Sequence, residues 1–158
     1  RWRWHLDEMF VKITVDPLSI KKTVDHEGEV LESFVTKTRD KKAALKFLKK
    51  AMRQHGQPHV IMTDRLASYG AALRELGAAN RQETGRWQNN RAENSHLPFR
   101  RRERAMQRFR RMRSLQKFAS VRDSVSNHFN QERSLSNRSH FKLNRAAALA
   151  EWRCLCAE

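Results

Sequence analysis

One carboxylate, Glu93, lies inside a run of basic and amide residues. Between residues 86 and 113 the chain carries ten arginines and only two acids, Glu93 and Glu103. Such a run is suited to bind the phosphates of a nucleic acid, so a carboxylate near its start needs a reason. Two explanations remain open. Glu93 is either a solvated ion-pair partner of Arg91 or Arg100, or one part of a metal site that acts on the bound phosphate.

Two further acids lie where the pattern predicts buried strands. Asp7 falls within residues 4–13, which are rich in aromatic and β-branched residues, and Asp64 ends the short apolar run 59–64. If these two strands are neighbours in one sheet, the acids lie side by side and the helix that carries Glu93 can pack over them. Three such carboxylates repel one another and stay ionised only around a hard cation, which suits Mg²⁺ or Mn²⁺.

The elements that must position these acids follow from hydrophobic periodicity and turn residues. Three strands with short links indicate an antiparallel meander, and the elements after it indicate an α/β domain. The predicted elements up to residue 84 are strands at 4–13, 18–24 and 30–36, a helix between Asp40 and Gly56, a strand at 59–64, a helix at 66–76, and a short strand or loop at 81–84.

The second half of the chain is predicted to be helical. Asn89 or Asn90 can cap the helix that holds Glu93, and Pro98 is expected to bend or end it. Apolar residues at helical spacing predict a long amphipathic helix at 109–132, and a last short helix is predicted at 146–152.

Composition favours a polyanionic partner. The 158 residues, enough for one domain, have a net charge of +16 and a pI near 11.0, so nucleic acid is the leading partner and an anionic membrane the lesser one. No apolar run is long enough to span a bilayer, and a soluble intracellular protein is expected. Cys154 and Cys156 are expected to be reduced and incidental, because no second pair completes a metal site.

Taken together, these residues resemble the catalytic domain of a bacterial DDE transposase, similar to the insertion-sequence-six family of the retroviral-integrase-like, ribonuclease-H-fold superfamily. The resemblance implies a ribonuclease-H-like mixed sheet with flanking helices, in the order β-β-β-α-β-α followed by C-terminal helices. It is carried by Trp4-His5-Leu6-Asp7-Glu8, by Thr63-Asp64-Arg65-Leu66-Ala67-Ser68-Tyr69, and by Asn89-Asn90-Arg91-Ala92-Glu93-Asn94-Ser95-His96 with the arginine run that follows.

The resemblance also implies a division of the chain. Residues 1–132 would be the catalytic core and residues 133–158 a C-terminal tail with a short helix. The helix-turn-helix region that such transposases carry before the core is absent, so specific recognition of element ends is not expected. Two features depart from the family: only 28 residues separate Asp64 from Glu93, and Lys21 and Lys22 stand where larger apolar residues are usual.

The implied activity is metal-dependent DNA cleavage and strand transfer during transposition of a bacterial insertion sequence. Asp7, Asp64 and Glu93 would be the catalytic residues and would hold two Mg²⁺ or Mn²⁺ ions. The expected partners are DNA at the element ends and target, and further copies of the chain on that DNA, with no membrane; the expected location is the bacterial cytoplasm, at the nucleoid. The residues expected to contact DNA are Arg86, Arg91, His96, Arg100, Arg101 and Arg102.

Other hypotheses remain open at this point. The chain can be a non-catalytic basic nucleic-acid-binding module in which the acids are structural, or a decayed transposase fragment. A ribonuclease-H-like nuclease without strand transfer differs only in its product. His96 lies one helical turn after Glu93 and either orients the phosphate or water, or is a polar residue of the helix surface. Tyr69 is expected to pack rather than to act as a nucleophile.

Overall fold

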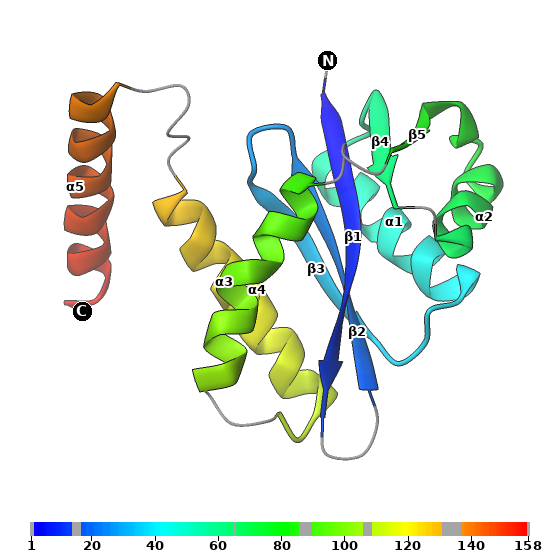
Figure 1. Cartoon of the computed structure of the whole chain (residues 1–158), viewed down its shortest axis with the longest axis horizontal. Coiled ribbons are helices and arrows are strands. Elements are labelled where there is room, and N and C mark those ends of the chain that lie inside the picture. Colours follow the sequence, from blue (N-terminus) through cyan, green and yellow to red (C-terminus); the bar gives the residue numbers. More distant parts are fainter. Residues whose placement is uncertain are drawn as a thin grey trace.

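The computed structural model describes residues 2–13, 17–64, 66–85, 90–105, 109–130 and 137–157, with the side chains of 90–95 and 105 excepted. Within these residues a mixed sheet is flanked by helices, as Figure 1 shows. The elements are β1 (Arg3–Lys12), β2 (Pro17–Asp25), β3 (Val30–Thr36), α1 (Lys41–His55), β4 (Val60–Thr63), α2 (Ala67–Glu75), the 3-10 helix η1 (Ala79–Arg81), β5 (Gln82–Thr84), α3 (Asn90–Ala105), α4 (Met112–Phe129) and α5 (Arg138–Leu155).

The strand order in the sheet is β3-β2-β1-β4-β5. The predicted meander is confirmed: β1 pairs with β2, and β2 with β3, in antiparallel fashion. The β2–β3 turn is held by the Asp25 side chain, which accepts hydrogen bonds from the backbone N–H groups of Glu27 and Glu29, and Gly28 takes the positive φ of 89° that the turn needs. The two later strands run parallel to β1, with β4 beside it and β5 at the far edge.

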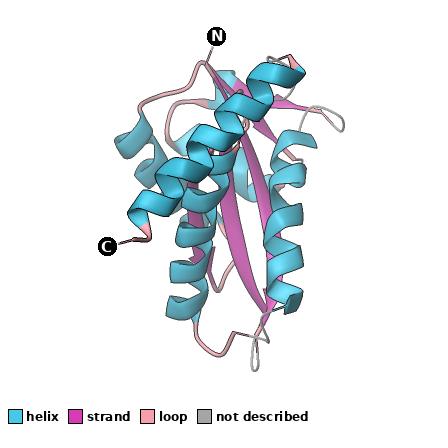
Figure 2. Ribbon diagram, turned by 90° about the vertical axis from the view of Figure 1, so that its left-hand side faces the viewer, coloured by secondary structure: helices cyan, strands magenta, loops and turns pink. Residues whose placement is uncertain are grey.

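Helices cover both faces of the sheet (Figures 1 and 2). On one face, α1 and α2 pack against Leu6 and Ile61, and on the other, α3 and α4 pack against Met9 and Val11. Leu6 and Met9 differ in parity along β1, and successive side chains of a strand point to opposite faces. The two cores therefore meet at β1, the central strand, which both faces bury.

The same alternation separates two neighbouring acids. Asp7 faces α3 and α4, whereas Glu8 faces α1 and α2, because each shares parity with the core residues of that face. In the register of β1 and β2, Asp7 lies opposite Lys22, and Glu8 lies opposite Lys21. A lysine therefore accompanies each acid on its own face.

Lys21 and Lys22 stand at two positions where apolar residues were expected from the sequence resemblance. Each lysine is buried and forms an ion pair. Lys21 Nζ lies 3.0 Å from Glu8 Oε2, and Lys22 Nζ lies 2.7 Å from Asp123 Oδ1 of α4. Carboxylates at these distances compensate the cost of burying the ammonium groups.

The edge strand β3 is protected by side chains of α4. The Asn127 amide accepts from the N–H of Val30 and donates to the Val30 carbonyl, at 2.9 and 2.8 Å. Nearer the start of α4, Gln116 accepts from the N–H of Val35 and donates to the Ser33 carbonyl, each at 2.8 Å. Free strand edges recruit other strands, so this pairing blocks a route to aggregation.

Three helices differ from the sequence prediction. Helix α3 continues through Pro98 to Ala105, so of the two expected effects of this proline, bending or ending the helix, the ending is excluded. Helix α4 ends at Phe129, three residues before the predicted end at 132. The C-terminal helix is not short: α5 has 18 residues and begins at Arg138, where the Asn137 side chain caps it by accepting the N–H of His140.

Helix α5 lies beside the end of α4 and crosses in front of the other elements in Figure 2. Trp152 packs against Phe129 and His128, and His128 Nε2 is 2.7 Å from the Ala148 carbonyl oxygen. Among the described helices, none has the length and apolar character needed to cross a membrane.

Candidate active site

Two of the three predicted catalytic acids, Asp7 and Asp64, come from the neighbouring strands β1 and β4. These strands are parallel neighbours, and their last paired residues are Leu6 and Thr63. Asp7 is the next residue of β1, and Asp64 directly follows the last residue of β4, so each acid comes one position after the last paired residue of its strand. The expectation that these strands are neighbours is confirmed.

Asp7 is buried, with 8% of its surface exposed, and its carboxylate has polar contacts. The N–H of Glu8 donates to Asp7 Oδ1 at 2.7 Å, and His96 Nδ1 of α3 lies 3.5 Å from Asp7 Oδ2. The N–H donor and the imidazole thus offset the cost of burying this acid. Helix α3 packs directly on β1 and β2, which brings His96 to this position.

The His96 ring is neutral near pH 7. Burial, followed by the positive charges of Lys22 and Arg100, lowers the pKa of His96 to about 4. The side chain is 14% exposed, and Nε2 has no hydrogen-bond partner in the described part of the chain. His96 therefore presents an uncharged ring to Asp7, and it is not a polar residue of the helix surface.

Asp64 is half-buried, and burial raises its pKa above the ordinary value. A hydrogen bond from the Leu66 N–H, at 3.4 Å, lowers the pKa, whereas the negative charge of Glu8 raises it. The charges of Arg39 and Lys21 act in the lowering direction. A cation beside Asp64 would relieve the cost of its charge, so this acid is suited to ligate one.

Glu8, the residue after Asp7, is the centre of a charged network with Lys21, Arg39 and Ser19. This network was not predicted from the sequence. Glu8 pairs with Lys21 with neither side chain exposed, and Arg39 Nε lies 3.2 Å from Glu8 Oε1. Ser19 Oγ donates to the same oxygen. The one sequence signal for this network was Lys21. Only the pairing of β1 with β2 shows that this lysine lies opposite Glu8.

Tyr69 joins this network to the backbone of β1. Its hydroxyl donates to the Asp7 carbonyl oxygen at 3.4 Å, and Lys21 Nζ lies 5.2 Å from its ring centroid. Burial raises the Tyr69 pKa well above the ordinary value, and the negative charges of Glu8, Asp64 and Asp7 add to that effect. The phenol is therefore protonated and buried, in agreement with the packing role expected for it.

The third acid and the arginine run are placed only in part. Glu93 belongs to α3, but its side chain lies outside the described residues, as does that of Arg91, and Arg86 lies outside them altogether. Within the described part of the chain, no group of three or more acidic, histidine or cysteine side chains is placed to hold a metal. Arg100 pairs with Glu103 at 2.9 Å, and Arg101 and Arg102 are exposed on α3.

Comparison with known protein families identifies the family of this chain. A family model described as a DDE domain matches residues 1–132 of the chain. The chain belongs to the DDE transposase family, of the insertion-sequence-six type. This DDE domain is similar to a Staphylococcus aureus transposase for the insertion sequence-like element IS431mec, with 28% identity over 100 residues. A transposase for the element IS257 in transposon Tn4003 matches equally well.

The match covers 60% of this chain and 45% of either relative, so the chain spans less than half the length of these transposases. Among solved structures, the catalytic core of BIV integrase superposes with a TM-score of 0.56 at 14% identity, covering 95% of this chain and 97% of that one. The HTLV-2 integrase catalytic core, solved in complex with magnesium, gives 0.53 at 16% identity, over 63% and 67%. These likenesses confirm the ribonuclease-H-like fold expected for the DDE domain.

Proposed function

We propose that this chain is the catalytic domain of a transposase that cleaves DNA and joins the freed end to a target strand. Membership of the DDE family supports this function. The observation that carries the proposal is the parallel pairing of β1 with β4, since Asp7 and Asp64 each come directly after the last paired residue of their strand. Helix α3, which contains Glu93, packs against β1.

The proposed metal ligands are Asp7, Asp64 and Glu93. Their oxygen donors are those that Mg²⁺ and Mn²⁺ prefer, and the raised pKa of Asp64 fits a position where a cation balances the charge. When bound, one or two such ions supply stabilisation for the negative charge that develops on the attacking and leaving oxygens of a phosphodiester. We expect two ions, and the magnesium complex of the HTLV-2 integrase core supports the use of that metal.

The surrounding residues have separate proposed roles. His96 holds Asp7 in position through its neutral ring, while Tyr69 fixes the Asp7 backbone from the opposite face. Arg86, Arg91, Arg100, Arg101 and Arg102 are proposed to bind DNA phosphates, and His96 to come near the scissile phosphate. Water attacks first and frees a 3′-hydroxyl, which then attacks the target strand, so no protein–DNA covalent bond is required.

The proposed partners are DNA and further copies of the chain. Transposition needs two element ends and a target, and the likeness to a chain of a simian T-cell lymphotropic virus intasome supports assembly on DNA. That relative superposes with a TM-score of 0.62 at 19% identity, over 81% of this chain and 49% of the other. Such a reaction places the protein in the bacterial cytoplasm, at the nucleoid.

The proposal is tested by strand cleavage with conservative variants. Asp7→Asn, Asp64→Asn and Glu93→Gln each remove one charge and keep the side-chain shape. We expect each variant to lose plasmid nicking in Mg²⁺ or Mn²⁺ by about a hundredfold or more while DNA affinity changes less than about threefold. Removal of a preorganised charge in an active site has effects of this order, ~10²–10³ in rate.

The matched control is Asp40→Asn, because Asp40 is an exposed acid that caps α1 and is not one of the proposed metal ligands. This variant should nick DNA like the wild type. Two results would reject the proposal: wild-type protein without metal-dependent nicking, which leaves a basic binding module, or full activity in Asp64→Asn. Joined products separate a transposase from a nuclease that only cuts.

A further inference from the structure

Helix α1 carries a basic face that the proposed reaction does not use. Between Lys41 and His55 the helix has no acid and six lysine or arginine residues. Its apolar side, with Phe47 and Leu48, is buried against the sheet. The outward side lines an open hollow of about 670 Å³, formed by Lys42, Leu45, Lys46, Lys49, Lys50 and Arg53.

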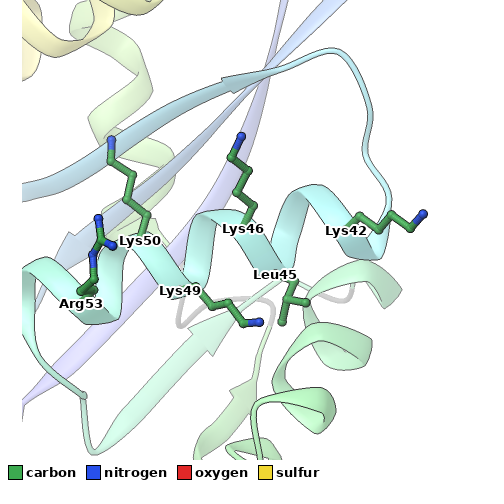
Figure 3. Close-up of a pocket in the computed structure, with 6 residues that line it drawn as sticks. All are labelled: Lys42, Leu45, Lys46, Lys49, Lys50 and Arg53. Atoms are coloured by element: carbon green, nitrogen blue, oxygen red, sulfur yellow. The ribbon is translucent and has the colours of Figure 1, made fainter.

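The side chains of this outward face diverge to its two sides. Figure 3 shows Lys46 and Lys50 on one side of the outward face and Leu45 and Lys49 on the other. Lysine and arginine can line such a hollow with their aliphatic stems while their charged ends stay in water. Lys46 and Lys50 are held above the Phe34 ring, 5.7 and 5.8 Å from its centroid.

Most of this positive charge is uncompensated. Lys41 pairs with Glu75, at 2.7 Å, and Lys50 pairs with Glu32, at 3.1 Å. The remaining four bases are exposed, and within the described ranges no carboxylate forms an ion pair with any of them. They are Lys42, Lys46, Lys49 and Arg53.

Spacing matches these four charges to a nucleic-acid strand. The offsets of four, three and four residues keep Lys42, Lys46, Lys49 and Arg53 on one helical face. At 1.5 Å per residue the row is about 16 Å long. One DNA strand carries a phosphate for each ~3.4 Å of duplex axis, so about five phosphates pass along the row.

The position of α1 separates this face from the arginines of α3. Helix α1 packs on the Leu6 face of the sheet and α3 on the Met9 face, and Figure 1 shows the two helices on opposite sides of β1. A straight duplex lying on α3 cannot also lie along α1. We propose that the outward face of α1 is a second DNA-backbone surface, which binds a duplex segment other than the one held at the acids.

This inference goes beyond the proposed reaction and requires no catalysis, so it is tested with metal removed. The probe is a fluorescent duplex of about 30 base pairs and arbitrary sequence, titrated in EDTA over a series of KCl concentrations. The α1 variant changes Lys42, Lys46, Lys49 and Arg53 to Gln. We expect Kd at about 100 mM KCl to rise about tenfold or more, and the log–log salt slope to decrease by about 3.6, which is ~0.9 for each phosphate that the variant no longer neutralises.

The control variant removes the same number of charges elsewhere. It changes four exposed bases of α5, Arg138, Lys142, Arg145 and Arg153, to Gln. Its salt slope should change by less than about one. Equal weakening in the two variants would overturn the inference, because total charge alone would then explain binding. Wild-type affinity in the α1 variant would overturn it directly.

Three further measurements make the result unambiguous. Circular dichroism checks that the α1 variant is folded, and if it is not, Lys46→Gln with Lys49→Gln replaces it, with an expected slope change of about 1.8. Asp64→Asn should keep the wild-type slope, so a failed catalytic proposal leaves this test intact. Vesicles containing anionic lipid are the competing probe: if they require the α1 bases and duplex DNA does not, the surface binds membranes and the inference is wrong.

Discussion

Neither side chain of the Glu8–Lys21 ion pair is exposed, although the pair lies one residue away from Asp7. Glu8 also receives Arg39 and Ser19, so its charge is balanced by several partners. At the residue scale, β1, the strand that contains Asp7, is thus stabilised by charged side chains that are buried in ion pairs. Such pairs add little net stability when intact but are costly to break.

Lys21→Met should therefore be strongly destabilising. The substitution leaves the Glu8 carboxylate buried with fewer partners, and breaking a buried pair costs about 3–5 kcal/mol. Urea unfolding measures the loss, and the double variant Lys21→Met with Glu8→Gln should recover part of it. The exposed pair between Lys41 and Glu75 is the control, because solvent screens it and Lys41→Met should have a much smaller effect on the free energy of unfolding. Equal losses in the two single variants would contradict this account.

His96 predicts a pH dependence of stability in the metal-free protein. Its pKa in the folded chain is about 4, below the ordinary value of 6.5, so the unfolded chain binds the proton more readily. The stability that depends on the neutral ring is present above pH 6.5 and is lost as the pH falls toward 4. At pH 5 the loss is about 2 kcal/mol relative to pH 7.

The measurement is urea unfolding at pH 7 and pH 5 in EDTA. His96→Gln has no titrating ring, so its stability should fall about 2 kcal/mol less than that of the wild type over the same interval. Other titrating groups are common to both proteins and cancel in the difference. Identical pH dependence in the two proteins would show that His96 is not held neutral.

How far the sequence predicts the site is clearest for single residues. The adjacency of the strands that precede Asp64 and contain Asp7 was predictable, because it follows from the strand order of the predicted fold. The contact of His96 with Asp7 was not, since it depends on the rotation of α3 over the sheet. The pair between Lys22 and Asp123 joins residues 101 positions apart, and no local pattern signals it.

At the element scale, the edge of the sheet depends on two amide side chains. Asn127→Ala or Gln116→Ala should each cost about 1–3 kcal/mol, because each removes two hydrogen bonds and leaves β3 backbone groups unpaired. Urea unfolding measures the cost, and light scattering should detect increased self-association through the exposed edge. Ser124→Ala, whose hydroxyl bonds only within α4, should change neither quantity appreciably.

Element prediction succeeded where one apolar face is repeated and failed where it is not. The meander and α1 follow from alternation, from helical spacing and from the Asp40 cap. Helix α5 was underestimated because it buries little: Ala148 is its one buried residue, and Leu143 and Leu155 are exposed. A helix with so weak an apolar face has little periodicity to detect, although the cap at Asn137 was a local signal.

At the scale of the whole molecule, we expect α5 to be dispensable for folding of the core. Its described contacts to the rest are those of Trp152 and Ala148 with the end of α4. A chain that stops after Glu132 should unfold cooperatively, with a free energy of unfolding lower by no more than about 2 kcal/mol. Circular dichroism of the helical signal during urea unfolding tests this boundary, and a non-cooperative transition would place α5 inside the folding unit.

The net charge of the whole molecule also affects its stability. A net charge of +16 destabilises a compact chain by self-repulsion. Binding of a polyanion to the two separate basic surfaces, on α1 and α3, reduces this repulsion. Duplex DNA should therefore raise the midpoint of thermal unfolding more at low salt than at high salt. A midpoint shift that is insensitive to salt would argue against charge neutralisation as the cause.

The most direct test of the central claim is the location of a bound ion in crystals grown with Mn²⁺, found from anomalous diffraction. The account predicts Mn²⁺ within ~2.0–2.6 Å of carboxylate oxygens from both Asp7 and Asp64, with Glu93 completing the site, and no such peak in Asp64→Asn crystals. An ion bound to one of these acids alone, or a common pocket that stays empty while Mn²⁺ occupies other sites, would contradict it.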